Sequence, residues 1–159
     1  MRAVIAAAAL ATVLFGCAGE TGRGLVPGQS TESQVEALMG PSADRRQKPG
    51  GETVRYYSRL PQGREMYAAR FGADGKLIAL EQRLTDENVA KLKADVSRAD
   101  DVRDLLGPPY RVTQFPLKGR EVWAYPMKGS PFPKLLQVEF TPDKVLREIF
   151  IHDDTLDPI

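Results

Sequence analysis

The chain has 159 residues, of which 42% are apolar, and 13 of its first 16 residues are apolar. Without that segment 143 residues remain, enough for one compact domain or two small repeats of roughly 60 to 70 residues and too few for a long multidomain enzyme. Lys and Arg number 22 against 21 Asp and Glu, so the chain lacks the basic excess of a nucleic-acid-binding protein. A single Cys and a single His exclude a disulfide framework and a Cys/His zinc site.

The N-terminus predicts export and lipidation. Residues 1–16 contain one Arg followed by a 13-residue apolar run, which is shorter than the roughly 20 residues of a membrane span and typical of a signal peptide. The next residues, Leu14-Phe15-Gly16-Cys17, resemble the bacterial lipobox. That resemblance implies a lipidated Cys17 at the start of the mature chain, and Ala18 after it implies the outer membrane. More than one acyl chain anchors a protein stably. The alternative is a plain export signal with an incidental Cys.

Residues 17–24 are small, polar and Gly-rich, which predicts a flexible tether between the lipidated cysteine and the folded part. Beyond the tether, an apolar helical triplet followed by Gly-Pro occurs twice at a constant offset of 67 residues. The matching positions are Val35, Leu38, Met39, Gly40 and Pro41, and Val102, Leu105, Leu106, Gly107 and Pro108. Farther along, Phe71 matches Phe140 at an offset of 69. The pattern predicts two homologous units, 25–84 and 85–153, with a C-terminal tail at 154–159.

Each unit is expected to begin with a short helix and to continue as antiparallel strands. Thr31 with Gln34 three residues later is typical of a helix start, and Ser97 takes that place in the second unit. A further helix is expected at 86–93. The expected strands are 53–59, 65–71 and 77–84, then 121–125, 135–140 and 145–152, with weaker ones near 44–47 and 110–115. Alternation along them predicts one core face and one wet face. The predicted fold class is α+β, with two tandem helix-then-strand repeats whose helices pack on one face of an antiparallel sheet.

Aromatic residues in the strands are the first candidates for a binding surface. Tyr56 and Tyr57 are adjacent, so one of them is expected in the core and the other on the surface. The repeat places Tyr57, Trp123 and Tyr125 on one face, where they are candidate anchors for a partner protein. The favoured alternative is that all four aromatic residues are core packing. Phe132, in the Pro-rich loop 126–133, is a further contact candidate, or belongs to a loop folded back on its own domain.

Several of these features together resemble the SmpA/OmlA family of small outer-membrane lipoproteins, which includes the E component of the β-barrel assembly machinery. The residues that carry the resemblance follow the lipobox and are Gly28, Thr31, Val35, Leu38 and Gly40, with Trp123-Ala124-Tyr125 in the second unit. The tandem arrangement is similar to that of the β-lactamase inhibitor protein, whose two helix-and-sheet repeats build one concave sheet. Both resemblances imply a protein that acts by binding other proteins without catalysis.

The sequence offers little support for catalysis. His152 leads an acidic run, but the run lacks the alternate ligand spacing around a Gly that known metal loops have, and a solvated strand end is the favoured interpretation. The chain contains neither a Gly-x-Ser-x-Gly elbow nor a Gly-rich phosphate loop. We therefore expect no enzyme, no catalytic residue, no metal and no cofactor.

The expected function is that of a lipoprotein anchored in the outer membrane and facing the periplasm. It is expected to bind envelope proteins, with the β-barrel assembly machinery as the leading candidate, and to contact the membrane through its lipid anchor but not nucleic acid. The alternative is an inhibitor of a periplasmic enzyme, and a binder of peptidoglycan or a lipid head group is a third possibility. An inhibitor is expected to present a protruding hairpin, and an assembly factor a broad patch next to the anchor.

Overall fold

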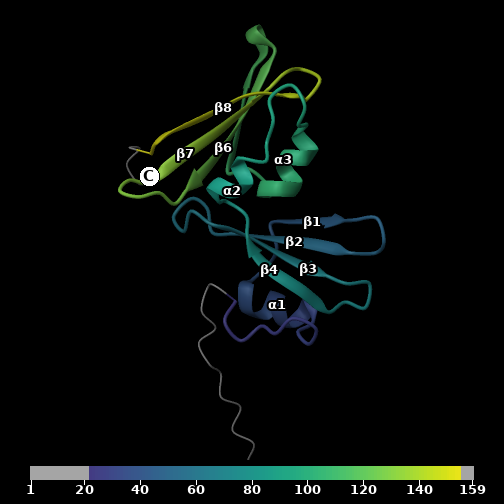
Figure 1. The fold of residues 1–159 in the computed structure, drawn as a ribbon. Coiled ribbons are helices and arrows are strands. Elements are labelled where there is room, and N and C mark those ends of the chain that lie inside the picture. The colour runs from purple at the N-terminus through teal and green to yellow at the C-terminus, as the bar shows by residue number, and fades with distance from the viewer. Residues whose placement is uncertain (1–21, 155–159) are drawn as a thin grey trace, which may run out of the picture.

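The computed structural model describes residues 22–154, which form two separate four-stranded antiparallel sheets (Figure 1). Of these residues, 41% lie in strands and 17% in helices. The fold is therefore mostly β, and the predicted α+β class with helices on one face of an antiparallel sheet is wrong. The helices are only three to eight residues long, and the weaker strand candidates near 44–47 and 110–115 are both formed. Each of them completes a sheet of its own.

The first sheet is a simple meander that follows one short helix. Helix α1 (Glu32–Met39) precedes β1 (Asp44–Gln47), β2 (Thr53–Ser58), β3 (Met66–Phe71) and β4 (Leu77–Gln82). Neighbouring strands in the chain are neighbours in the sheet, in the order β1-β2-β3-β4.

The second sheet has the same order of strands and follows two helices. They are α2 and α3, and the sheet order is β5-β6-β7-β8. The elements are α2 (Asp86–Val89), α3 (Ala99–Leu106), β5 (Arg111–Phe115), the 3-10 helix η1 (Pro116–Lys118), β6 (Arg120–Met127), β7 (Lys134–Phe140) and β8 (Leu146–Asp153).

Local sequence explains where the two longer helices begin and end. At α1 the predicted capping box is confirmed, because the Gln34 backbone N–H donates to Thr31 Oγ1 at 3.3 Å and the Thr31 N–H donates to Gln34 Oε1 at 2.8 Å. The predicted Ser97 cap of α3 is wrong. Arg98 is the N-cap, and the Ser97 hydroxyl instead accepts the Lys93 N–H at 3.0 Å. Gly40 and Gly107 end the two helices at φ values of 80° and 86°.

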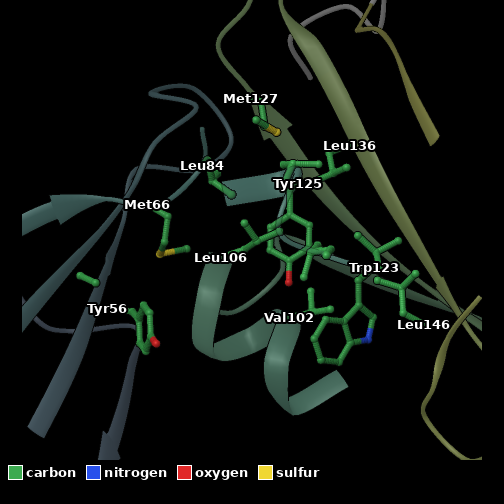
Figure 2. Close-up of a cluster of buried hydrophobic side chains, with 14 of the residues drawn as sticks. Tyr56, Met66, Leu84, Val102, Leu106, Trp123, Tyr125, Met127, Leu136 and Leu146 are labelled. Atoms are coloured by element: carbon green, nitrogen blue, oxygen red, sulfur yellow. The ribbon is translucent and has the colours of Figure 1, made fainter. Parts of the chain in front are cut away.

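Two buried clusters hold the layers together. The smaller one lies between α1 and one face of the first sheet, and it consists of Val35, Met39, Tyr57, Ala69, Phe71 and Leu77. The larger one joins the other face of that sheet to α3 and the second sheet (Figure 2), and it includes Tyr56, Met66, Val102, Leu106, Tyr125, Leu136 and Leu146. The layers therefore run α1, first sheet, α3, second sheet (Figure 1). Helix α3 lies between the sheets, and β4 and β5 do not pair.

This layering overturns the expected wet face for the first sheet. Tyr56 and Tyr57 point to opposite faces, yet both are 0% exposed, because both faces of the sheet are covered. The expectation that one of the two is on the surface is therefore wrong.

The two halves share several local geometries. Backbone hydrogen bonds tie the segment before each helix to the last strand, Gly28 N–H to Leu77 at 2.7 Å and Asp95 N–H to Leu146 at 2.8 Å. A register shift occurs in the third strand of each sheet, just before Phe71 and just before Phe140. The two halves therefore share these local geometries, and their division into two homologous units at residue 84 stays a prediction.

The predicted signal peptide and Cys17 lie outside the described residues, as does most of the C-terminal tail. Among the helices that the structure describes, none has the length and apolar character needed to cross a membrane.

Candidate interaction surface

The two faces of the second sheet differ in burial. Strand pairing places Trp123 opposite Val138 on the face toward α3, where both are buried. The next position along, Val122, is opposite Thr113 and Glu139, and these side chains point away from α3. We call this second side the outer face. The two buried clusters contain none of its side chains.

The outer face contains a shallow hollow of about 230 Å³ that crosses all four strands. Its walls include two half-exposed aromatic side chains, Phe115 at 44% and Phe150 at 41% exposure. The full lining is Thr113, Phe115, Lys118, Arg120, Val122, Gln137, Glu139 and Phe150. An exposed apolar strip framed by polar groups is typical of a protein interaction site.

Cations outnumber carboxylates on the outer face. Glu139 is only 7% exposed and is shared by two arginines, with its Oε1 lying 3.2 Å from Arg120 Nη1 and 3.5 Å from Arg147 Nε. Lys118 forms no ion pair within the described part of the chain, and Arg111 lies over the Tyr110 ring at 5.7 Å from its centroid. The face therefore carries a local positive excess although the chain as a whole is close to neutral.

Beside the hollow, the β5-η1-β6 hairpin projects beyond the core. All five residues of β5 are exposed, and Leu117 at the tip is fully exposed. Gly119 closes the tip in the left-handed conformation at φ 59°. Figure 1 shows this green hairpin extending away from α3 and the first sheet.

The structure separates the residues that the sequence grouped as partner anchors. Tyr57 is 0% exposed beneath α1, and Tyr125 is 0% exposed against α3. Trp123 is 8% exposed, and Phe132 is 60% exposed in the loop between β6 and β7. Tyr57, Trp123 and Tyr125 each face the helix of their own half, so they share no open surface. Their positions agree with the core-packing alternative.

Polar contacts fix the buried aromatic side chains. The Tyr125 hydroxyl donates to the Gly107 carbonyl at 3.2 Å, and burial raises its pKa. The Trp123 indole N–H donates to Glu121 Oε1 at 2.7 Å. Burial opposes ionisation of Glu121, but hydrogen bonds from Lys144 and Trp123 outweigh it and hold the Glu121 pKa below its ordinary value. These aromatic side chains therefore act as internal supports of the second sheet.

Sequence reasoning missed Phe115, Val122 and Phe150 as surface residues. A signal for Phe150 was present in Ile149-Phe150-Ile151, because three consecutive apolar residues in a strand must place at least one on each face. Phe115 ends a strand that was only weakly predicted. Its partner positions in the sheet were therefore unknown.

Of the acidic run that begins at His152, only His152, Asp153 and Asp154 lie within the described residues. Within residues 22–154, no group of three or more His, Cys, Asp or Glu side chains is placed to hold a metal ion. His152 itself is an exposed residue near the end of β8. Asp154 of the same run is not solvated, because its side chain is only 7% exposed and its Oδ2 lies 2.5 Å from Arg64 Nη1. The interpretation as a solvated strand end therefore fits His152 but not Asp154.

No family model and no curated protein matches the chain. Among solved structures, it is similar to the crystal structure of a DUF4309 family protein (YjgB) from Bacillus subtilis, with 14% sequence identity over 86% of each chain and a TM-score of 0.34. Neither family membership nor function follows from these comparisons, and the resemblance to the SmpA/OmlA family stays a prediction.

Proposed function

We propose that the protein is a noncatalytic protein-binding module, anchored to the outer membrane by Cys17 and facing the periplasm. Its role is in outer-membrane assembly or envelope maintenance, with envelope proteins such as the β-barrel assembly machinery as partners. The observation that carries the proposal is the uncovered outer face of the second sheet, with Phe115 and Phe150 beside its hollow.

Burial across the molecule supports this choice of surface. Among the apolar side chains of the second half that are at least 41% exposed, Phe115 and Phe150 lie on the outer face, whereas Val112 and Ile151 lie at the edges of the inner face. Aromatic side chains on a rigid sheet make strong anchors, because they bury a large area at a low cost in side-chain entropy. The hollow is shallow and contains only one acidic residue, Glu139, which is already paired with arginines. A protein surface fits such a site better than a small substrate does.

The projecting hairpin supports a second candidate function, inhibition of a periplasmic enzyme. Leu117 is fully exposed at the tip, and the tight turn at Gly119 holds it away from the core. A narrow apolar projection of this kind fits a cleft in a partner, whereas the outer face fits a broad surface. The two candidates therefore depend on different residues of one sheet.

Affinity capture from cross-linked envelopes separates these functions. The lipidated wild-type chain is compared with Phe150→Ser, Leu117→Ser and the control Ile78→Ser, which changes a 44% exposed residue of the first sheet. We expect envelope assembly proteins to be captured by the wild type and the control and to be lost with Phe150→Ser. Capture of one soluble enzyme that depends on Leu117 would favour the inhibitor. If no protein is captured above background, the proposed function fails.

Lipidation at Cys17 is tested separately by mass spectrometry of the mature protein. We expect an acylated, blocked Cys17 as the first residue, and an unmodified chain after Cys17→Ser. The anchor is disproved by a mature chain that begins elsewhere with a free amino group. The protein-binding surface does not depend on that result.

A further inference from the structure

Described residues cover both faces of the first sheet and the middle strands of the inner face of the second sheet, whose edge residues Val112 and Ile151 are each 48% exposed. The first sheet is covered by α1 on one side and by α3 on the other, and the inner face of the second sheet packs on α3. Among the described sheet faces, only the outer face combines exposed aromatic side chains with a hollow. The one described helix that contributes to the lining of this hollow is η1, through its last residue, Lys118. Whatever binds there comes from outside these layers.

The hollow has the dimensions of an extended chain. Its lining runs from Phe115 on β5, through Val122 on β6 and Gln137 on β7, to Phe150 on β8. Three spacings between strands amount to about 14 Å, and the register places Phe150 in the row of Arg111, four residues or about 13 Å along the strands from Phe115. The diagonal between the two aromatic side chains is therefore roughly 19 Å, the length of about six extended residues. The aromatic side chains stand at the two ends of this path, so an occupant would bury apolar side chains at both ends.

Charge defines the chemistry of the occupant. Four cations lie on or beside the face, namely Arg111, Lys118, Arg120 and Arg147, against the two carboxylates of Glu139 and Glu148. Arg120 and Arg147 share the single Glu139 carboxylate, so their guanidinium groups keep donors for a second acceptor. Lys118 has no carboxylate partner within residues 22–154. A carboxylate brought by the occupant would complete this set.

From these three features we propose that the outer face of the second sheet binds an extended segment of a partner protein that carries Asp or Glu beside aromatic or aliphatic side chains. This inference rests on the proposed function and adds the class of segment that the surface recognises. The segment lies across the four strands, with its apolar side chains against Phe115 and Phe150. Its carboxylates pair with Lys118 and the arginines.

The test selects ligands without assuming the partner. A displayed library of random 12-residue peptides is selected on the full-length protein, and the affinities of enriched peptides are then measured by fluorescence anisotropy. The variants are Phe150→Ser and Lys118→Glu. The matched controls are Ile78→Ser and Lys93→Glu, which change one apolar and one cationic residue that are exposed outside the second sheet.

We expect the enriched peptides to contain more Asp and Glu than Lys and Arg, together with aromatic or aliphatic residues. Binding should weaken at least tenfold with Phe150→Ser and with Lys118→Glu, and should change less than twofold with the two controls. Increasing the salt concentration should weaken binding to the wild type, because the pairs with Lys118 and the arginines are partly exposed. Neutral or basic peptides, equal losses in the controls, or no enrichment would each overturn the proposal.

Other occupants give different results, and each also overturns it. A wild-type dimer in sedimentation that Phe150→Ser dissociates would identify a second copy of the chain. Binding to phosphatidylglycerol vesicles that Lys118→Glu abolishes, without peptide binding, would identify an anionic membrane. Peptide binding that appears only after Leu156→Ser would identify residues 155–159 of this chain as the occupant of the outer face.

The outcome is distinguishable from failure of the proposed function. If Phe150→Ser retains the captured envelope proteins while Leu117→Ser or a change at Phe132 loses them, the protein-binding function stands and this surface does not. If acidic peptides bind as expected but the envelope yields no partner, the surface stands and the role in the envelope does not.

Discussion

At the scale of single residues, matching positions in the two halves have different surroundings. Gly40 and Gly107 both end a helix at positive φ, with ψ of −170° and −174°. A Cβ added at Gly40 would meet no atom within 4 Å, because the residue faces open space. At Gly107 it would lie 2.6 Å from Met66 Cγ and 3.0 Å from Tyr56 Cδ1. Glycine is therefore needed at position 107 for two reasons, its backbone conformation and the close approach of α3 to the first sheet.

This contrast predicts unequal costs for the same substitution. Gly40→Ala should lower the free energy of unfolding by about 1 to 3 kcal/mol, because a residue with a Cβ is strained in this backbone region. Gly107→Ala should cost a further 1 to 3 kcal/mol, because the new methyl group overpacks the larger cluster. Urea unfolding of both variants measures the difference. Equal losses would contradict the close approach of α3 to Met66 and Tyr56.

A second prediction at this scale concerns the buried hydroxyl of Tyr56, which donates to the Asp104 carbonyl at 2.8 Å. Burial raises the pKa of Tyr56 from 10.0 to about 12. The folded state therefore retains the proton longer than the unfolded state, and this contribution is complete below pH 10 and is lost between pH 10 and 12.

Replacing Tyr56 by Phe should make the free energy of unfolding fall less steeply between pH 10 and 12, by up to roughly 2 kcal/mol over that range. Chemical unfolding at several alkaline pH values measures the slope. The wild type provides the reference, because the other tyrosines and the lysines titrate in both proteins. The same slope in both proteins would contradict the assigned environment of Tyr56.

At the scale of elements, charged side chains join the two halves across the junction of β1 and α3. Arg46 Nε lies 2.8 Å from Asp104 Oδ1, and Lys48 pairs with the other oxygen of the same carboxylate. Arg103 Nε lies 2.8 Å from Asp44 Oδ2 in the opposite sense. Strand β1 and helix α3 each contribute one positively and one negatively charged side chain to these ion pairs. The pairs therefore hold α3 in one position along β1.

Asp104→Asn should therefore destabilise the protein by about 1 kcal/mol, because Arg46 of β1 and Lys48 just after it lose their shared partner. Asp100→Asn is the matched control, since the Asp100 side chain is 86% exposed and forms an ion pair with Arg46 at 3.2 Å. Its expected effect is within about 0.5 kcal/mol. Thermal unfolding at low salt and in 1 M NaCl compares the stabilities of the two variants. The difference between them should be smaller in 1 M NaCl, because salt screens the ion pairs. A larger loss for Asp100→Asn would refute the assignment.

Most strands and helix starts could be predicted from the sequence, because they depend on local patterns. Alternation located β2, β3, β6 and β7, and the Thr31 capping box located α1. The edge strands β1 and β5 gave a weak signal, because an exposed strand needs no apolar alternation. Residue spacing also cannot show that α3 packs on two sheets at once. That arrangement is a long-range contact between residues such as Tyr56 and Leu106.

At the scale of the whole molecule, the layered order explains why the candidate site was misplaced. Aromatic strand residues are equally typical of a core and of an interface, and the extra layer formed by α3 buries Trp123 and Tyr125. The same layering leaves the outer face of the second sheet as the uncovered one. In our proposal, Phe115 and Phe150 take the role of partner anchors for which Trp123 and Tyr125 were candidates from the sequence. Phe132 remains exposed, on a loop at the end of that sheet.

We propose that the protein contacts its partners through this outer face, and site-specific photocross-linking in intact envelopes can detect that contact at single positions. A photoreactive phenylalanine analogue is placed at position 150 on the outer face, at position 117 on the hairpin tip, and at position 78 on the first sheet. We predict a strong cross-link to an envelope protein from position 150 and none from position 78. Equal cross-linking from position 78, or none from position 150 while position 117 reacts, would contradict the claim.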